Sequence, residues 1–170
     1  MDVHAIQVLF DYNYTAHDRV WDCVMELSPE QFVEEADYSW RSIRNHLVHV
    51  MSVDNRWLAR VDNRPLPDRL EPADYPDQDA TREMWNDVRD NVISYVTTIS
   101  QSAVSEMLAI DLPHRGGQYQ NLRWEILLHM VNHGTDHRAQ MLARLHDLGA
   151  ITVEQDMILY LWEKQRRSLS

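Results

Sequence analysis

The sequence contains few of the residues that interrupt helices or cross-link chains. Among its 170 residues there are four glycines, six prolines and one cysteine. A proline inside a helix costs about 3 kcal/mol, so the positions of the prolines indicate where helices are excluded. All six lie between stretches of helical periodicity, at Pro29, Pro65, Pro67, Pro72, Pro76 and Pro113. The lone Cys23 excludes an intrachain disulfide and fits a reducing compartment.

Basic residues and long apolar runs are also scarce. There are 16 Lys and Arg against 27 Asp and Glu, which gives a formal net charge of -11 at pH 7. Such a surface repels the phosphates of nucleic acids and the head groups of anionic lipids. No run of 18 or more apolar residues is present, and the N-terminal MDVHAIQVLF lacks the basic region of a secretion signal. These features predict a cytoplasmic protein whose partners are neither nucleic acids nor membranes.

Apolar residues recur with helical spacing in four long stretches. The first covers about residues 2–27 and the second about residues 40–61. The third has its apolar stripe over residues 85–103, with Met107 near its end, and the fourth runs over residues 122–148. Gly149 follows the fourth stretch and is suited to the left-handed conformation that ends helices.

The segments between these stretches predict turns and short helices. Ser28, Pro29 and Gln31 have the spacing of a capping box that begins a short helix. Residues 62–79, rich in Pro and acids, are interpreted as a long surface crossover. Thr152 could cap a final short helix through Trp162. Because we find no repeat and no convincing strand, we expect one all-α domain over residues 1–170, a four-helix bundle.

The most distinctive motif is HMVNHGTDH in the fourth stretch, which places His129, His133 and His137 four residues apart. Residues so spaced on a helix have Cβ atoms about 5–6 Å apart, so either neighbouring pair could bind one metal ion. Spacing alone does not choose between the pairs. A row of residues four apart drifts about 40° around the helix at each step, which brings His137 nearest the apolar face. An interior site would therefore use His133 and His137, with His129 at its rim.

A third ligand has to come from another helix, because two protein ligands rarely suffice. His46 and His49 in the second stretch are the candidates. The apolar stripe of that stretch places His46 closer to the core than His49, but periodicity leaves the choice open.

Two known metal motifs do not fit this sequence. A zincin needs Glu directly after the first His of its motif, where this chain has Gly134. A di-iron bundle needs Glu three residues before His, whereas Glu125 lies four before His129. Gly134 costs a helix about 1 kcal/mol relative to Ala, and we interpret it as simple tolerance rather than as close approach of a ligand or helix. Asp136 could orient a ligand imidazole, but a solvated acid is the favoured interpretation.

Three pieces of the sequence, in this order, resemble the DinB/YfiT-like superfamily of small metal-binding helical bundles. They are residues 10–27, which begin FDYNYTAH; SIRNHLVH at residues 42–49 with RWL after it; and LHMVNHGTDHRAQ at residues 128–140. The resemblance covers nearly the whole chain, including the Pro-rich crossover.

The resemblance implies an up-down-down-up bundle that is commonly a homodimer. It also implies one divalent metal ion, zinc, nickel or another, held by His49, His133 and His137. The choice of His49 over His46 therefore rests on the resemblance and goes against the periodicity.

Known activities of the superfamily are thiol chemistry, so the resemblance implies transfer of a low-molecular-weight thiol to an electrophilic small-molecule substrate. Two alternatives remain open. One is a hydrolase that uses ion-bound water, and the other is a non-enzymatic dimeric bundle with a structural metal. Cys23 is interpreted as packing rather than as the nucleophile. Four tryptophans are interpreted mainly as core residues: Trp21, Trp57, Trp85 and Trp124.

Overall fold

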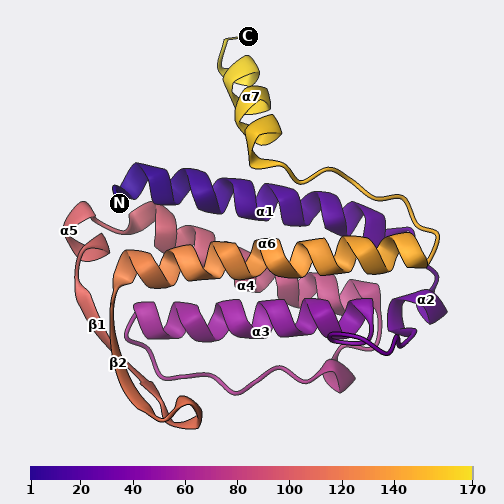
Figure 1. Cartoon of the computed structure of the whole chain (residues 1–170), viewed down its shortest axis with the longest axis horizontal. Helices are drawn as coiled ribbons and strands as arrows, with labels where there is room; N and C mark the ends of the chain where they lie inside the picture. Colours follow the sequence, from indigo (N-terminus) through magenta and orange to yellow (C-terminus); the bar gives the residue numbers. More distant parts are fainter. Residues whose placement is uncertain (170) are drawn as a thin grey trace.

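The computed structural model describes residues 1–169, apart from the side chain of His114, and four long helices form its body (Figure 1). They are α1 (Val3–Met25), α3 (Ile43–Val61), α4 (Gln78–Thr98) and α6 (Arg123–Asp147). Helices α1 and α6 run in one direction and α3 and α4 in the other, as in an up-down-down-up bundle. Each of α1 and α3 packs against both α4 and α6.

Polar side chains cap the N-termini of three of the long helices. Asp2, Ser42 and Asp77 each accept a hydrogen bond from the backbone of the first turn of α1, α3 and α4. Beyond α6, Gly149 has φ +75°, the left-handed conformation predicted for it. The apolar stripes then meet in one core, whose largest fully buried members include Trp21, Trp85, Phe32, Leu47, Met51, Leu127, Met130 and Met141.

The expectation that the chain has no strand was wrong. β1 (Met107–Leu112) and β2 (Gly117–Leu122) pair antiparallel, and the short η2 (Pro113–Arg115) connects them. The third helix is correspondingly shorter than expected, since α4 ends at Thr98 and the separate α5 (Gln101–Val104) follows. In β1 every second side chain, at Leu108 and Ile110, is buried. That alternation is the period of a strand, but it covers too few residues to stand out in the sequence.

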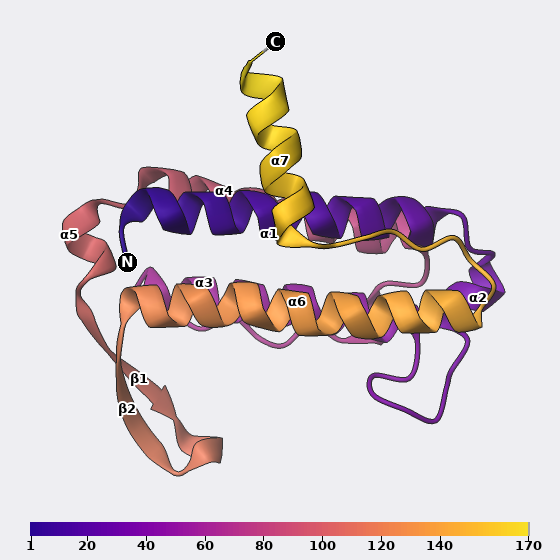
Figure 2. The same cartoon turned by 45° about the horizontal axis from the view of Figure 1, so that its top comes forward.

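The shorter helices agree with the predictions in part. α2 (Pro29–Val33) begins with the expected capping box, in which Ser28 and Gln31 bond reciprocally. The crossover before α4 contains only η1 (Pro72–Asp74). α7 (Met157–Ser168) follows Asp156 without a side-chain cap, so the predicted cap at Thr152 was wrong. Figures 1 and 2 show α7 projecting away from the four long helices.

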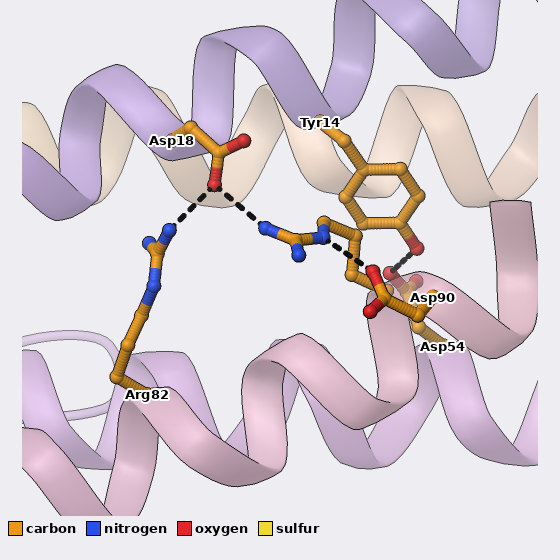
Figure 3. A network of polar contacts seen from close by, with 6 residues as sticks. Tyr14, Asp18, Asp54, Arg82 and Asp90 are labelled. Carbon is orange, nitrogen blue, oxygen red and sulfur yellow. Dashed lines mark hydrogen bonds and ion pairs between the residues drawn. The ribbon is translucent and has the colours of Figure 1, made fainter.

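Polar contacts join α1 to the two helices that run opposite to it (Figure 3). The Asp18 carboxylate on α1 accepts from Arg82 at 2.9 Å and from Arg89 at 3.3 Å, both on α4. The Tyr14 hydroxyl donates to Asp54 on α3 at 2.9 Å, and both side chains are buried. These contacts fix the position of α1 against α3 and α4. No described helix is both long enough and apolar enough to cross a membrane.

Candidate metal centre

Three histidines from two packed helices meet near the middle of the bundle. His49 lies on α3, and His133 and His137 lie one turn apart on α6. One ring nitrogen from each lies within 4.8 Å of the others, and the Nε2 atoms of His49 and His133 are 3.2 Å apart. The His137 ring centroid is 4.7 Å from that of His49 and 4.3 Å from that of His133. The structure thus brings together the three residues that the sequence resemblance singled out.

These distances suit a single metal ion. With metal to nitrogen bonds of 2.0–2.1 Å, two ligand nitrogens of a tetrahedral zinc site are about 3.3 Å apart. The 3.2 Å between His49 and His133 is close to this value. Among the side chains that the structure describes, no other group of three His, Cys, Asp or Glu offers ligand atoms so close together.

The surroundings hold these histidines in the neutral form that metal binding requires. Burial and the neighbouring imidazoles lower the pKa of His49 to about 3 and that of His133 to about 4. Burial also lowers the pKa of His137, although the nearby Asp136 opposes the shift. At neutral pH each of the three imidazoles therefore has an unprotonated nitrogen available for an ion.

The other two candidate histidines lie beside the cluster rather than in it. His129 is exposed, and its ring centroid is 6.0 Å from that of His133 and 5.3 Å from that of Trp57, which places it at the rim as predicted. His46 is 2% exposed, so the periodicity was right that it is the more deeply buried of the second-helix pair. Its ring centroid is 5.3 Å from that of His137, but its Nε2 lies 3.2 Å from Gln140 Oε1 and 3.3 Å from Ser39 Oγ, and His46 is not one of the three clustered ligand candidates.

The histidine cluster opens onto a cavity of about 630 Å³. His49, His133 and His129 line one side of it. Other parts of its wall come from α3, the crossover that precedes α4, and the β-hairpin, through residues such as Trp57, Leu70 and Leu112. A small molecule in this cavity would therefore lie directly against two of the three clustered imidazoles.

Comparison with known proteins identifies the family. The sequence profile of the DinB family matches residues 1–168. The chain belongs to the DinB family. It is 27% identical over 159 residues to Protein DinB of Bacillus subtilis (strain 168), which covers 91% of this chain and 92% of that protein. It is 26% identical over 112 residues to the uncharacterized protein YkkA of the same strain, covering 57% and 61% of the two chains.

A solved structure has the same fold as this DinB-family chain. The crystal structure of a DinB-like protein from Bacillus cereus ATCC 10987 superposes with a TM-score of 0.63. The match covers 85% of this chain and 94% of that one, at 13% sequence identity. At this identity the likeness supports the fold alone.

Sequence reasoning missed a residue beside the cluster, Trp40. Its ring stacks on the His49 imidazole, with centroids 3.8 Å apart and planes 18° apart. Trp40 was expected to begin the second helix, but α3 begins at Ile43 and Trp40 lies in the preceding loop. Ser39 and Arg41 on either side have φ of +51° and +73°. Neither is a glycine or asparagine, so nothing in the sequence signals this turn.

The interpretation of Gly134 as simple tolerance was wrong. A Cβ on Gly134 would overlap the Asn13 side chain and lie 3.1 Å from His17 Nε2, both on α1. It would also lie 3.2 Å from the Arg138 guanidinium. The glycine therefore permits α1 and α6 to approach directly behind His133, which is the helix contact that the sequence analysis had considered and set aside.

Asp136 agrees with its favoured interpretation. Its side chain is exposed, and its carboxylate accepts from the Gln140 amide at 3.2 Å. Among the described contacts, no histidine ring donates to it. Asp136 is a solvated helix acid that acts on His137 only through its charge.

Proposed function

We propose that this protein is a metal-dependent enzyme in which His49, His133 and His137 hold a divalent ion, zinc, nickel or another. The observation that carries the proposal is a cluster of three neutral imidazoles that opens onto a cavity large enough for a small organic molecule. Pockets for small ligands are typically about 300–1,000 Å³. Structural metal sites, by contrast, are closed by a fourth protein ligand.

The reaction that we propose is transfer of a low-molecular-weight thiol to an electrophilic small molecule. A divalent ion held by three neutral ligands keeps open positions and lowers the pKa of a thiol bound there. The chain itself would orient the metal ligands. The stacked Trp40 fixes the plane of the His49 ring, and Gly134 lets α1 support α6 behind His133.

The thiol would have to come from a small molecule rather than from the chain. Cys23 is 5% exposed on α1, and its Sγ donates to the Arg19 carbonyl oxygen at 3.4 Å. Burial raises the pKa of this thiol, which disfavours the reactive thiolate. Cys23 does not line the cavity beside the histidines. Its part in the fold is packing.

A screen of the metal-loaded protein against low-molecular-weight thiols and electrophiles tests the proposed reaction. We expect thiol consumption that stops when a chelator removes the metal and that is lost in His137→Ala. His146→Ala, at an exposed position near the end of α6 and outside the cavity lining, is the matched control and is expected to retain most of the activity. If the panel shows no metal-dependent thiol consumption while esters or amides are hydrolysed, the site activates water and the transferase proposal is wrong.

A further inference from the structure

Four arginines from three parts of the chain line the cavity beside the histidines. Arg56 and Arg60 come from α3, Arg69 from the crossover, and Arg115 from the turn of the β-hairpin. Glu71 is the one carboxylate in the same lining. This concentration of positive charge occurs in a chain whose formal net charge is -11.

These four arginines differ from most others in the molecule. Eight arginines elsewhere form ion pairs with Asp or Glu: Arg19, Arg41, Arg64, Arg82, Arg89, Arg123, Arg144 and Arg167. Over residues 1–169, none of the cavity arginines lies within ion-pair distance of a carboxylate, Glu71 included. With so many acids in the chain, four unpaired guanidinium groups around one cavity are conspicuous.

The contacts that these arginines do make leave most of their donors available. Arg56 donates one N–H to the Pro67 carbonyl oxygen, which joins α3 to the crossover. Arg60 donates one to the Arg56 carbonyl oxygen at 3.2 Å, and its guanidinium lies 4.9 Å from the Trp57 ring centroid. A guanidinium carries five N–H donors in a planar fork. Guanidinium groups that no carboxylate neutralises suit an oxyanion that can accept two hydrogen bonds at once, such as a carboxylate or a phosphate.

The histidine cluster adds no negative charge to the cavity. Its three members are neutral imidazoles, and a divalent ion held there would add two positive charges. Arg69 is close enough to His49 that its charge contributes to the lowered pKa of that imidazole. The positive region of the cavity therefore continues up to the cluster.

We propose that the cavity binds an organic anion, a small molecule whose carboxylate or phosphate group is held by Arg56, Arg60, Arg69 and Arg115. Its other end would extend to the three-histidine cluster. The proposal of an anion site is argued from the four arginines alone. That the bound anion is the substrate rests on the proposed function. A carboxylate and a phosphate can each accept two parallel hydrogen bonds from a guanidinium group, and the experiment distinguishes which of the two the cavity binds.

Calorimetric titration of the full-length protein, before and after removal of metal by a chelator, tests the anion site. The probes are succinate for carboxylates and phenyl phosphate for phosphates, with neutral succinamide as the matched control. We expect at least one of the two anions to bind, more weakly as NaCl is raised, and succinamide not to bind measurably. If neither anion binds better than succinamide, the proposal is wrong.

The double variant Arg69→Gln with Arg115→Gln locates the site. Both side chains are exposed, so the variant is expected to fold, and we expect the Kd of the bound anion to rise at least tenfold. Arg44→Gln with Arg166→Gln removes the same charge outside the cavity and is expected to change the Kd less than twofold. Equal weakening in both double variants would show only a general charge effect and would overturn the proposal.

Failure of this proposal and of the proposed function are distinguishable. If the anion binds through Arg69 and Arg115 but no thiol is transferred, the anion-site proposal is confirmed and the transferase proposal is wrong. If thiol transfer proceeds equally well with neutral and anionic substrates and is unchanged in the variant with Arg69→Gln and Arg115→Gln, the transferase proposal is confirmed and the anion-site proposal is wrong.

Discussion

At the scale of single residues, Gly134 determines how closely α1 approaches the helix that carries two of the clustered histidines. Replacing an ordinary helical Gly with Ala is worth about 1 kcal/mol of added stability. At Gly134 the new Cβ would overlap Asn13 and press on His17 and Arg138. Overpacking of this kind typically costs about 1–3 kcal/mol. We therefore predict that Gly134→Ala lowers the free energy of unfolding, as measured by urea denaturation.

Asn132→Ala is the matched control for this substitution. Asn132 is exposed on the same helix, two residues from Gly134, and its replacement is expected to change stability by less than about 0.5 kcal/mol. A stabilised Gly134→Ala protein would show that the helices do not meet so closely, and the steric account of this glycine would be wrong.

Asp54 is a second residue whose burial has a measurable consequence. Its Oδ2 accepts from Tyr14 while its Oδ1 has no partner among the described residues, and burial raises its pKa to about 7. An unfolded Asp has a pKa near 3.9. Between these two values the Asp54 carboxyl of the folded protein retains a proton that the unfolded chain has released, so the contribution of Asp54 to stability falls as pH rises from about 4 to 7 and is level above that.

Asp54→Asn should remove this pH dependence. Relative to the wild type, we expect the variant to gain stability as pH rises from 4 to 8, by up to about 4 kcal/mol at 1.36 kcal/mol for each pH unit. Urea denaturation of both proteins at several pH values measures the difference. Asp87→Asn, on the exposed side of α4, is the control and should differ from the wild type by a constant amount. A constant difference for Asp54→Asn as well would mean that Asp54 is ionised throughout.

At the scale of helices and strands, the sequence predicted the elements that have a long apolar stripe or a capping motif, and it missed the elements that have neither. The four long helices were predicted because each buries a continuous apolar stripe, and α2 because Ser28 and Gln31 form a capping box. The hairpin was missed because β1 has only two buried alternating positions, Leu108 and Ile110. The loop that carries Trp40 was missed because its backbone conformation is set by tertiary contacts, such as the bond from the Tyr38 hydroxyl to the Gln140 carbonyl oxygen at 3.0 Å.

The histidine cluster, too, could be predicted within one helix but not between two helices. Helical drift selected His133 and His137, since both lie on one helix whose phase can be calculated. It could not choose His49, because which side of α3 faces α6 depends on how the helices pack. The resemblance supplied that information.

The capping box of α2 can be tested directly. The Ser28 side chain accepts from the Gln31 backbone at 3.2 Å, and the Gln31 side chain in turn accepts from the Ser28 backbone at 2.9 Å. Removing such a cap typically costs about 0.5–2 kcal/mol. We predict a loss in this range for Ser28→Ala, measured by urea denaturation.

Ser105→Ala, at an exposed position after α5, should be nearly neutral by comparison. If Ser28→Ala were equally neutral, the capping box would contribute nothing to the anchoring of α2, and the buried Phe32 would be its main attachment.

At the scale of the whole molecule, the homodimer implied by the resemblance stays a prediction. Helix α7 projects from the bundle and exposes Ile158 and Trp162, each about half accessible to solvent. Exposed apolar side chains on a projecting helix favour contact with another chain. We predict twice the chain mass of 20.1 kDa in light scattering coupled to size exclusion. A mass equal to one chain across the micromolar range would contradict this.

The central claim is that His49, His133 and His137 together hold one divalent ion, and metal content measures it most directly. After incubation with zinc or nickel and removal of unbound ion, we predict about one equivalent per chain in the wild type and in His129→Ala. The variants His49→Ala, His133→Ala and His137→Ala should each lose most of it while retaining the helical circular dichroism of the wild type. A wild-type protein without stoichiometric metal, or a His129→Ala variant that loses metal as completely as the other three, would contradict the account.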